Sequence, residues 1–227
     1  MRLMTTNLEF MKPEGVNHAV IATTSFSVSA GKTFIDTNLA ACLADAQKKV
    51  VLIDCDLRKR TISKQFGLKH KATGLSNYLF DEAMDVAAII RPNVIEGVDF
   101  VPAGHVPPNP TELLGRKRFD NLIAELKKTY DYIILDSVPV NVVADPYVIN
   151  RVTDMNLFVL RSGQVDKRIL PELDSLYESG KLNSMAIVLN GSVVRRAYGA
   201  YGYGYGYGYG YGYGYGYGYG YGKDDKK

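Results

Sequence analysis

A short loop of small residues precedes Lys32 and Thr33, and the stretch Ala30-Gly31-Lys32-Thr33 is typical of a phosphate-binding loop. In such a loop, backbone N–H groups turn toward a phosphate, and the N-terminus of the following helix adds partial positive charge. Lys32 would contact the β and γ phosphates, and the Thr33 hydroxyl would bind Mg²⁺. Phe26 stands where the full motif has its first glycine, so the sequence keeps only the second half of the pattern.

Two aspartates, Asp54 and Asp56, follow a run of apolar residues that predicts a buried strand. Side chains alternate between the faces of a strand, so these two carboxylates would point the same way and Cys55 the opposite way. Neighbouring carboxylates repel unless they share a proton or a cation, and Mg²⁺ prefers carboxylate and phosphate oxygens. The pair therefore indicates a magnesium site beside the loop; the alternative is a strand-end turn with two solvated aspartates.

A third carboxylate, Asp136, ends the apolar run YIILD. An aspartate at a strand tip near a phosphate-binding loop is typical of a Walker B motif, where it holds Mg²⁺ directly or through water. Arg58 follows the acidic pair and is either another charge near the site or an ordinary surface arginine. Together these residues favour a site for a nucleotide such as ATP with Mg²⁺.

The elements that would position these residues alternate between strand and helix. The predicted strands are 18–24, 49–56, 131–137, 156–161 and 184–190, with 99–102 as a weaker candidate. Helices are predicted at 33–47, 111–130, 144–151 and 166–180. The strands are nearly continuous apolar runs, as expected for parallel strands covered on both faces. This pattern predicts a doubly wound α/β fold with a mostly parallel sheet, of the P-loop NTPase type.

Two smaller patterns refine this prediction. Asn109, Pro110 and Glu112 predict a helix start with a capping box. On the helix at 33–47, Phe34, Leu39, Cys42 and Leu43 would share one apolar side.

Composition excludes several classes of protein. The chain has 227 residues, a formal net charge of +3 and no dense basic stripe, so nucleic acid is not an expected partner. Its two cysteines are too few for a disulfide framework or a zinc cluster. No signal peptide and no apolar run long enough to cross a membrane is present. We expect an N-terminal segment at 1–17, a single domain at 18–197 and a compositionally distinct tail at 198–227.

Several segments together resemble the bacterial tyrosine kinases. The matching segments are 30–33 (AGKT), 51–59 (VLIDCDLRK), 74–79 (GLSNYL), 102–114 (PAGHVPPNPTELL), 132–136 (YIILD) and 189–191 (LNG). A tyrosine-rich C-terminus completes the likeness, which covers nearly the whole chain. The resemblance implies a protein-tyrosine kinase that uses ATP and Mg²⁺ and has no kinship in fold with eukaryotic kinases.

The resemblance also implies roles for individual residues. The implied catalytic residues are Lys32, Asp54, Asp56 and Asp136, with Asp54 as the base toward the tyrosine hydroxyl. The implied nucleotide contacts are Ser29, Ala30, Gly31, Lys32, Thr33, Phe34 and Asn190, the last near the base. The implied magnesium ligands are Thr33, Asp56 and Asp136. Tyr78 matches an internal tyrosine that some members phosphorylate.

The tail is almost purely tyrosine and glycine, which favours disorder because so much glycine leaves little to pack. Beside a kinase-like site, its tyrosines are predicted phosphoacceptors. They are Tyr198, Tyr201, Tyr203, Tyr205, Tyr207, Tyr209, Tyr211, Tyr213, Tyr215, Tyr217, Tyr219 and Tyr221. The alternative is an aromatic linker, or an alternating strand prone to self-pairing.

Partners follow from the same resemblance. It implies regulation of capsular or extracellular polysaccharide synthesis and export, with a membrane-embedded co-polymerase segment or adaptor and a cognate tyrosine phosphatase as partners. The site would then be cytoplasmic, at the inner face of the bacterial membrane. Members form rings through a Glu-x-x-Arg-x-x-Arg motif; Arg2 matches its first arginine, Thr5 replaces its second, and the glutamate would precede Met1. We therefore expect a homo-oligomer and a chain that begins inside this motif.

Two other functions fit the same motifs. Partition and division-site ATPases share the expected fold, but they carry a lysine five residues before the main one, where this chain has Ser27. A nucleotide switch that assembles and disassembles without phosphorylating tyrosine is the second alternative. It is kept open by Val28 and Val138, which replace residues common in the kinase family.

Overall fold

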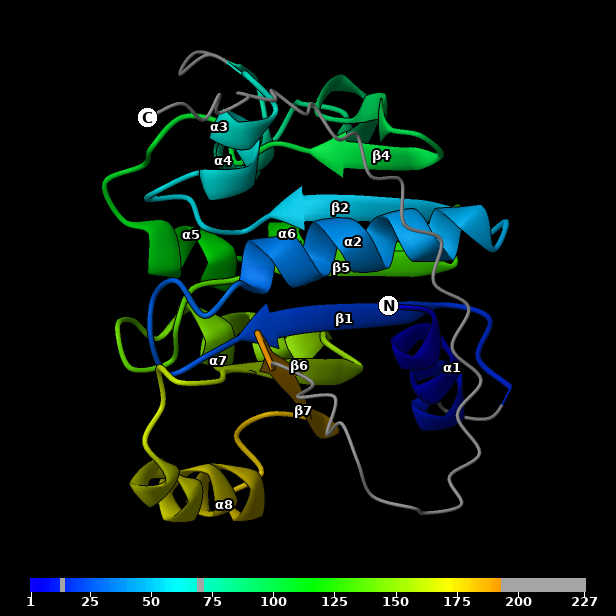
Figure 1. The fold of residues 1–227 in the computed structure, drawn as a ribbon. Coiled ribbons are helices and arrows are strands. Elements are labelled where there is room, and N and C mark those ends of the chain that lie inside the picture. Colours follow the sequence, from blue (N-terminus) through cyan, green and yellow to red (C-terminus); the bar gives the residue numbers. More distant parts are fainter. Residues whose placement is uncertain (13–14, 69–71, 193–227) are drawn as a thin grey trace, which may run out of the picture. The chain divides into compact units, whose positions relative to one another are not determined.

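The computed structural model describes residues 1–12, 15–68 and 72–192, and Met1–Ser192 form one compact unit (Figure 1). The predicted tail lies outside the described residues, and so do all of its tyrosines. Within the described part of the chain, no helix is both long enough and apolar enough to cross a membrane.

A seven-stranded sheet forms the centre of the molecule, in the order β3-β4-β2-β5-β1-β6-β7. The strands are β1 Ala19–Thr24, β2 Val50–Asp54, β3 Arg91–Ile95, β4 Val98–Val101, β5 Tyr132–Asp136, β6 Met155–Arg161 and β7 Met185–Asn190. Neighbours pair in parallel except β3, which runs antiparallel to β4. The mostly parallel α/β fold is therefore confirmed, and β3 is the strand that the sequence did not predict.

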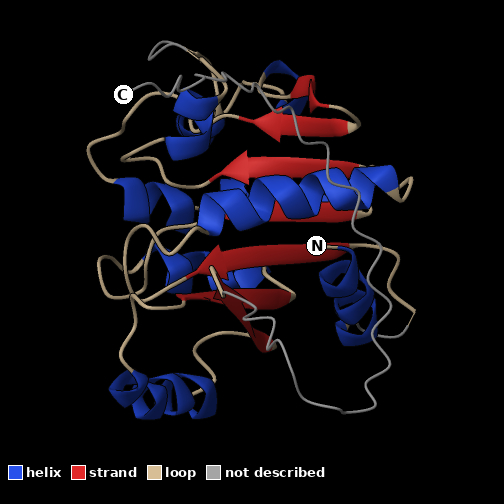
Figure 2. Ribbon diagram, viewed as in Figure 1, coloured by secondary structure: helices blue, strands red, loops and turns tan. Residues whose placement is uncertain are grey.

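Helices cover both faces of this sheet (Figure 2). The α-helices are α1 Arg2–Met11, α2 Lys32–Asp45, α3 Thr61–Gln65, α4 Leu75–Phe80, α5 Pro110–Gly115, α6 Lys117–Leu126, α7 Asp145–Ile149 and α8 Leu170–Glu178. Short 3-10 turns are η1 Val86–Ala88, η2 Asn150–Val152 and η3 Lys167–Ile169. Helices α1 and α2 pack on one face with α3, and α4 to α7 pack on the other. Helix α8 covers β6 on the same side as α7.

Three local predictions need correction. The single helix expected at 111–130 is two helices, because Arg116 has extended backbone (φ −68°, ψ 147°) and starts α6 afresh. The break lets α5 and α6 bury separate apolar stripes in one core. Helix α5 does start at Pro110, but Asn109 makes no capping hydrogen bond. Its amide instead donates to Glu112 at 3.2 Å, so the capping box is absent.

The apolar side expected for α2 is also only partly right. Leu39 and Leu43 are buried against the sheet, and Cys42 is half-buried. Phe34 points to solvent with 59% of its surface exposed, because it lies off the buried stripe of α2, which includes its neighbours Ile35 and Asp36.

The parallel pairing brings the chemistry-bearing residues together. Strands β2, β5 and β1 are adjacent, and Asp136 is level with Asp54 on one side and with Thr23 on the other. Because parallel strands end at the same edge of the sheet, the loops that follow β1, β2 and β5 surround one site there.

Candidate nucleotide and phosphotransfer site

The loop between β1 and α2 has the conformation of a phosphate cradle. Ser29 and Gly31 both adopt positive φ, at 63° and 97°, and such turns point successive N–H groups toward a common centre. A Cβ on Gly31 would lie 2.1 Å from the amide nitrogen of Asn190, so a side chain at this position would clash. That amide donates to the carbonyl of Ala30 at 2.9 Å and so fixes the loop against β7.

Lys32 lies at the base of this cradle and is buried. Its ammonium group donates to the Ser25 hydroxyl at 3.1 Å. Burial lowers the pKa of Lys32, while the nearby carboxylates of Asp136, Asp36 and Asp56 oppose that shift. A cation held among carboxylates in a partly dry site is well suited to contact phosphate oxygens.

Thr33 and Asp136 meet across the site. The Thr33 hydroxyl donates to Oδ2 of Asp136 at 2.9 Å. Burial raises the pKa of Asp136 to about 6, and the hydrogen bonds from Asp36 and Thr33 limit the increase. The two side chains predicted to surround a magnesium ion are therefore in direct contact.

Asp54 and Asp56 are the two carboxylates predicted to point the same way from the end of β2. Strand β2 ends at Asp54, and Cys55 is buried in the core on the face away from α2. Asp54 is fully buried, and its Oδ2 accepts hydrogen bonds from the backbone N–H and the hydroxyl of Ser63, at 2.9 and 2.6 Å. Asp56 lines the pocket and accepts from the backbone N–H groups of Arg58 and Lys59. The two carboxylates thus occupy different environments.

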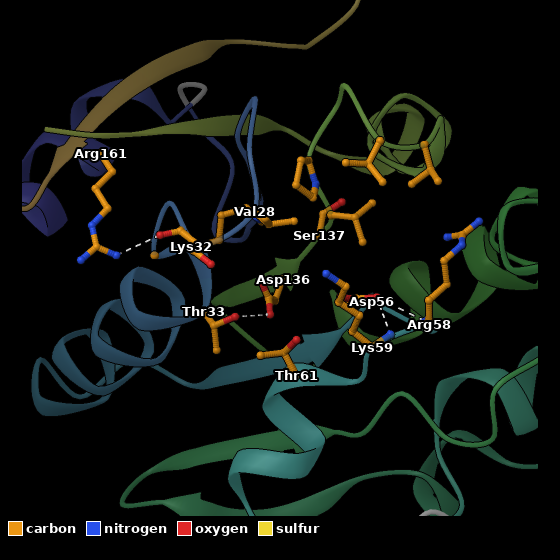
Figure 3. Close-up of a pocket in the computed structure, with 16 residues that line it drawn as sticks. Val28, Lys32, Thr33, Asp56, Arg58, Lys59, Thr61, Asp136, Ser137 and Arg161 are labelled. Carbon is orange, nitrogen blue, oxygen red and sulfur yellow. Dashed lines mark hydrogen bonds between the residues drawn. The ribbon is translucent and has the colours of Figure 1, made fainter. Parts of the chain in front are cut away.

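A cavity of about 390 Å³ is lined by Lys32, Thr33, Asp56 and Asp136 but not by Asp54 (Figure 3). Its lining residues are Val28, Ser29, Gly31, Lys32, Thr33, Asp56, Arg58, Lys59, Thr61, Asp136, Ser137, Val138, Pro139, Val142, Val143 and Arg161. Four of them are cationic and two are acidic, which suits a polyphosphate that brings a divalent cation.

The polar groups of the cavity fit Mg²⁺ and phosphate. The Ser137 hydroxyl is buried at the cavity wall and has no hydrogen-bond partner among the described residues. Thr33, Asp56 and Asp136 supply the hard oxygen atoms that Mg²⁺ prefers. An unsatisfied hydroxyl beside these oxygens is the expected companion of a ligand that brings its own oxygen atoms.

Not every predicted site residue lines the cavity. Of the predicted nucleotide contacts, Ser29, Gly31, Lys32 and Thr33 line it, whereas Ala30, Phe34 and Asn190 do not. Ala30 is buried and the side chain of Phe34 is exposed, so the contacts predicted for these two residues stay predictions. The Asn190 side chain instead donates a hydrogen bond to the loop, at the carbonyl of Ala30. Its predicted place near the nucleotide base stays a prediction.

Tyr78, predicted as an internal phosphoacceptor, is only 5% exposed. The guanidinium carbon of Arg118 lies 4.1 Å from the centre of its ring, and Arg118 also donates to the Tyr78 carbonyl at 2.6 Å. Phosphorylation at Tyr78 stays a prediction. The predicted acceptors of the tail lie outside the described residues.

Two further cations of the cavity, Lys59 and Arg161, were not predicted from the sequence. Arg161 ends β6, and it donates to the Ser29 carbonyl at 3.0 Å. The rule that ligands bind beyond strand ends could have found it, because β6 is next to β1. Arg58 lines the cavity as well, but its guanidinium is also paired with buried Asp145.

Comparison with known proteins decides the family. A family model described as an AAA domain matches residues 18–154. Tyrosine-protein kinase CpsD of Streptococcus pneumoniae is 36% identical over 185 residues, which are 81% of this chain and 81% of CpsD. This chain belongs to the bacterial tyrosine kinases. Its match to the kinase domain of Escherichia coli tyrosine kinase ETK has a TM-score of 0.77 at 34% identity and covers 90% of this kinase and 78% of that chain.

Other matches differ in extent. Tyrosine-protein kinase Wzc of Salmonella typhi is 35% identical over 199 residues, which are 88% of this kinase but 27% of Wzc, so the chain spans about a quarter of that relative. The septum site-determining protein MinD of Pyrococcus horikoshii has a TM-score of 0.60 at 20% identity, over 76% of this chain and 70% of that one. The MinD match shows a shared fold only.

Asp36 is another buried carboxylic acid of this site, and it was not predicted from the sequence. It lies on α2, has no exposed surface, and accepts a hydrogen bond from the Thr23 hydroxyl at 2.6 Å. Burial and the neighbouring charge of Asp136 raise the pKa of Asp36 well above its usual value. The raised pKa favours the protonated form of Asp36 and a hydrogen bond from it to Asp136.

We predict that Asp36→Asn stabilises the fold near neutral pH by about 1 kcal/mol or more. The amide keeps both hydrogen bonds, while the unfolded wild-type chain gains stability by ionising Asp36 above its unfolded pKa of about 3.9. The advantage should therefore grow as pH rises above about 4 and vanish below that value. Urea unfolding at several pH values measures it.

Asp174→Asn, at an exposed position of α8, is the matched control and should change stability by less than about 0.5 kcal/mol. If Asp36→Asn were less stable than the wild type at neutral pH, Asp36 would be ionised in the folded protein and the assignment of the proton would be wrong.

Proposed function

We propose that this kinase transfers the γ-phosphoryl group of ATP to the tyrosines of its own C-terminal tail. The observation that carries the proposal is that Lys32, Asp56 and Asp136 line the same cavity, at the carboxyl ends of the parallel strands. Family membership supports the tyrosine kinase class. Twelve of the chain's 17 tyrosines lie in the tail, so the acceptor is present at high local concentration.

Positioning and charge stabilisation account for most of phosphoryl transfer, and the cavity supplies both. Backbone N–H groups of the loop and the ammonium of Lys32 would hold the β and γ phosphates. Thr33, Asp56 and Asp136 would hold Mg²⁺, which neutralises charge on the phosphate oxygens when bound. The cation of Arg161, which fixes the loop through Ser29, adds to the positive field at this end of the cavity.

We propose Asp54 as the base that accepts the tyrosine proton. Burial raises the pKa of Asp54 to about 7, which suits a base that works at neutral pH. Oδ2 of Asp54 is engaged by Ser63, while Oδ1 is buried without a hydrogen-bond partner in the described part of the chain. The incoming tyrosine must therefore open a path to Oδ1. Asp56 already lines the cavity and is proposed as a magnesium ligand instead.

We propose that transfer runs in trans, between neighbouring subunits of a homo-oligomer. Fully extended, the roughly 24 residues of the tyrosine-glycine stretch span on the order of 80 Å, which is enough to reach another molecule. Each phosphotyrosine adds about −1.5 to −2 charges, so a few would outweigh the net charge of +3 and weaken an assembly held by tail contacts. A cognate phosphatase would reverse this change.

The proposed biological role is control of capsular or extracellular polysaccharide synthesis and export. It rests on the resemblance to kinases with that role. In this proposal the chain acts at the cytoplasmic face of the bacterial membrane, through a membrane-embedded co-polymerase segment or adaptor.

Lys32→Met should abolish phosphotyrosine formation with Mg-ATP, with a loss of at least about 100-fold, because the buried ammonium no longer meets the transferring phosphate. Mass spectrometry of phosphatase-treated protein, before and after Mg-ATP, checks this as a ladder of phosphate additions mapped to the tail. Undiminished labelling of the variant would rule out the proposed site. Release of free phosphate by the wild type without tail labelling would favour the ATPase or switch alternatives.

Asp54→Asn and Asp56→Asn should fail in different ways. Asp54→Asn should lower kcat about 100-fold or more while ATP binding persists, because only the proton acceptor is lost. Asp56→Asn should mainly raise the Mg²⁺ concentration needed for half-maximal rate, because a metal ligand is lost. Rates measured against ATP and Mg²⁺ separate the two roles. Equal kcat for Asp54→Asn and the wild type would place the base elsewhere.

A mixture of two variants, neither of which can phosphorylate its own tail, tests transfer between molecules. One partner carries Lys32→Met with its tail intact, and the other keeps Lys32 but has all twelve tail tyrosines changed to phenylalanine. Phosphate should appear on the Lys32→Met chain only in the mixture, because the acceptors and the active cavity then lie on different molecules. Wild-type protein alone is the positive control. Labelling of the wild type without any in the mixture would show transfer within one chain.

A further inference from the structure

The cavity has an apolar side that the proposed phosphate and metal contacts leave unused. It is formed by the valine wall, which we define as Val28, Val138, Pro139, Val142 and Val143. Val28 and Val142 are 47% and 60% exposed, although both line a cavity. Apolar side chains in such a position favour a ligand that covers them, because the contact removes apolar surface from water.

Strand order places most of the valine wall beside the predicted magnesium ligands. Residues 138–143 follow β5, which lies between β1 and β2. Strand β1 leads into the phosphate loop, and β2 leads to Asp56. The wall therefore adjoins the part of the cavity where an acceptor would meet the last phosphate group of ATP.

Hydrogen bonds hold both parts of the valine wall in place. The Thr24 hydroxyl donates to the carbonyl of Val138 at 2.9 Å, and the Gln164 amide donates to the carbonyl of Val28 at 3.1 Å. Because these bonds use backbone carbonyls, the valine side chains themselves remain available to a ligand. A surface that is ordered before binding loses little conformational entropy when the ligand arrives.

An ion pair fixes the end of the valine wall. Asp145 follows Val143 by two residues, is buried and pairs with the guanidinium of Arg58. Arg58 also donates to the Thr111 hydroxyl at 2.9 Å. The loop after β5 is thus tied to α5 and to the loop after β2, so the wall keeps its place relative to the carboxylates of the site.

We propose that the valine wall is the subsite for the aromatic ring of the acceptor and that it selects tyrosine over serine and threonine. The five side chains of the wall are apolar and offer no hydrogen bond, so they suit the flat apolar surface of a ring. Serine and threonine carry their hydroxyl next to the backbone and have no such surface to place on the wall. The inference rests on the proposal that phosphoryl transfer takes place in this cavity.

The adenine base of ATP is the other flat ring that could occupy the wall. The predicted base contact, Asn190, ends β7, which is separated from β1 by β6, whereas the loop at 138–143 follows β5 on the other side of β1. Figure 3 shows Arg161, the last residue of β6, and Arg58, which is tied to the wall, at opposite sides of the cavity. Strand order thus favours the acceptor ring at the wall and the base on the β6 side.

Steady-state kinetics of the full chain test the subsite, with a glycine-rich peptide that carries one tyrosine as the acceptor. Val142→Ser should raise the KM for this peptide about tenfold, because a polar side chain no longer covers the ring. The kcat and the KM for ATP should stay within about twofold of the wild type, because the ring contact is the same before and during transfer. Val142→Leu keeps an apolar side chain and should retain the wild-type KM. Mass spectrometry separates the phosphorylated peptide from the phosphorylated chain.

Val106→Ser is the matched control, since Val106 is 55% exposed but does not line the cavity. It should leave both KM values unchanged. An unchanged peptide KM in Val142→Ser would overturn the proposal. A raised KM for ATP with an unchanged peptide KM would assign the wall to the nucleotide base and overturn the proposal as well.

Two related peptides separate recognition of the ring from recognition of the backbone. With phenylalanine in place of tyrosine, the peptide should inhibit competitively, with an inhibition constant within about threefold of the KM for the tyrosine peptide. With serine in that place, inhibition should need a concentration at least about tenfold higher. Equal inhibition by the two peptides would show that the ring is not recognised and would contradict the proposal.

Binding measured without turnover separates this inference from the proposed function. In NMR spectra of the chain loaded with Mg-ADP, the phenylalanine peptide should shift the methyl signals of Val28 and Val142 but not those of Val106. Such shifts, together with no phosphotyrosine on any substrate, would uphold the subsite and overturn the proposed transfer. Phosphorylation of the tyrosine peptide without these shifts would uphold the transfer and overturn the subsite.

Discussion

Three carboxylic acids buried at one edge of the sheet, Asp36, Asp54 and Asp136, impose the constraint on which the rest of the site depends. Buried carboxylates close to one another cannot all ionise without a large electrostatic cost. Each accepts a hydrogen bond from one hydroxyl: Thr23 bonds to Asp36, Ser63 to Asp54 and Thr33 to Asp136. Lys32 is the cation of this cluster, and its own burial is offset by the charges of Asp136, Asp36 and Asp56.

This arrangement divides the acids by protonation and by access. Burial and the charge of Asp136 raise the pKa of Asp36 well above its usual value, which favours the protonated acid and so lowers the repulsion between the two. Asp56 lines the cavity, where a divalent cation can reach it, while Asp54 is held below it by Ser63. A cluster that is costly when empty is stabilised by the ligand it is shaped to bind, so stability and function are coupled through the same charges.

The large-scale features of the fold could be predicted from the sequence because they depend on local periodicity. The apolar runs that became β1, β2, β5, β6 and β7 were recognisable, and so was the Gly-Lys-Thr end of the phosphate loop. What the sequence could not supply depends on tertiary context. The different surroundings of Asp54 and Asp56 follow from the contact of Asp54 with Ser63 and of Asp56 with the loop after β2. Asp36 is an ordinary polar residue on α2 until packing buries it. The break at Arg116 likewise follows from the need of α5 and α6 to bury different stripes.

The alternation of tyrosine and glycine suits the substrate of the proposed transfer. A kinase site needs single side chains that enter a cavity, and the absence of a side chain on every neighbouring residue lets the backbone approach closely. Because the repeats are identical, one cavity would accept any of them in turn. Phosphate groups would then accumulate in graded steps, each adding about −1.5 to −2 charges.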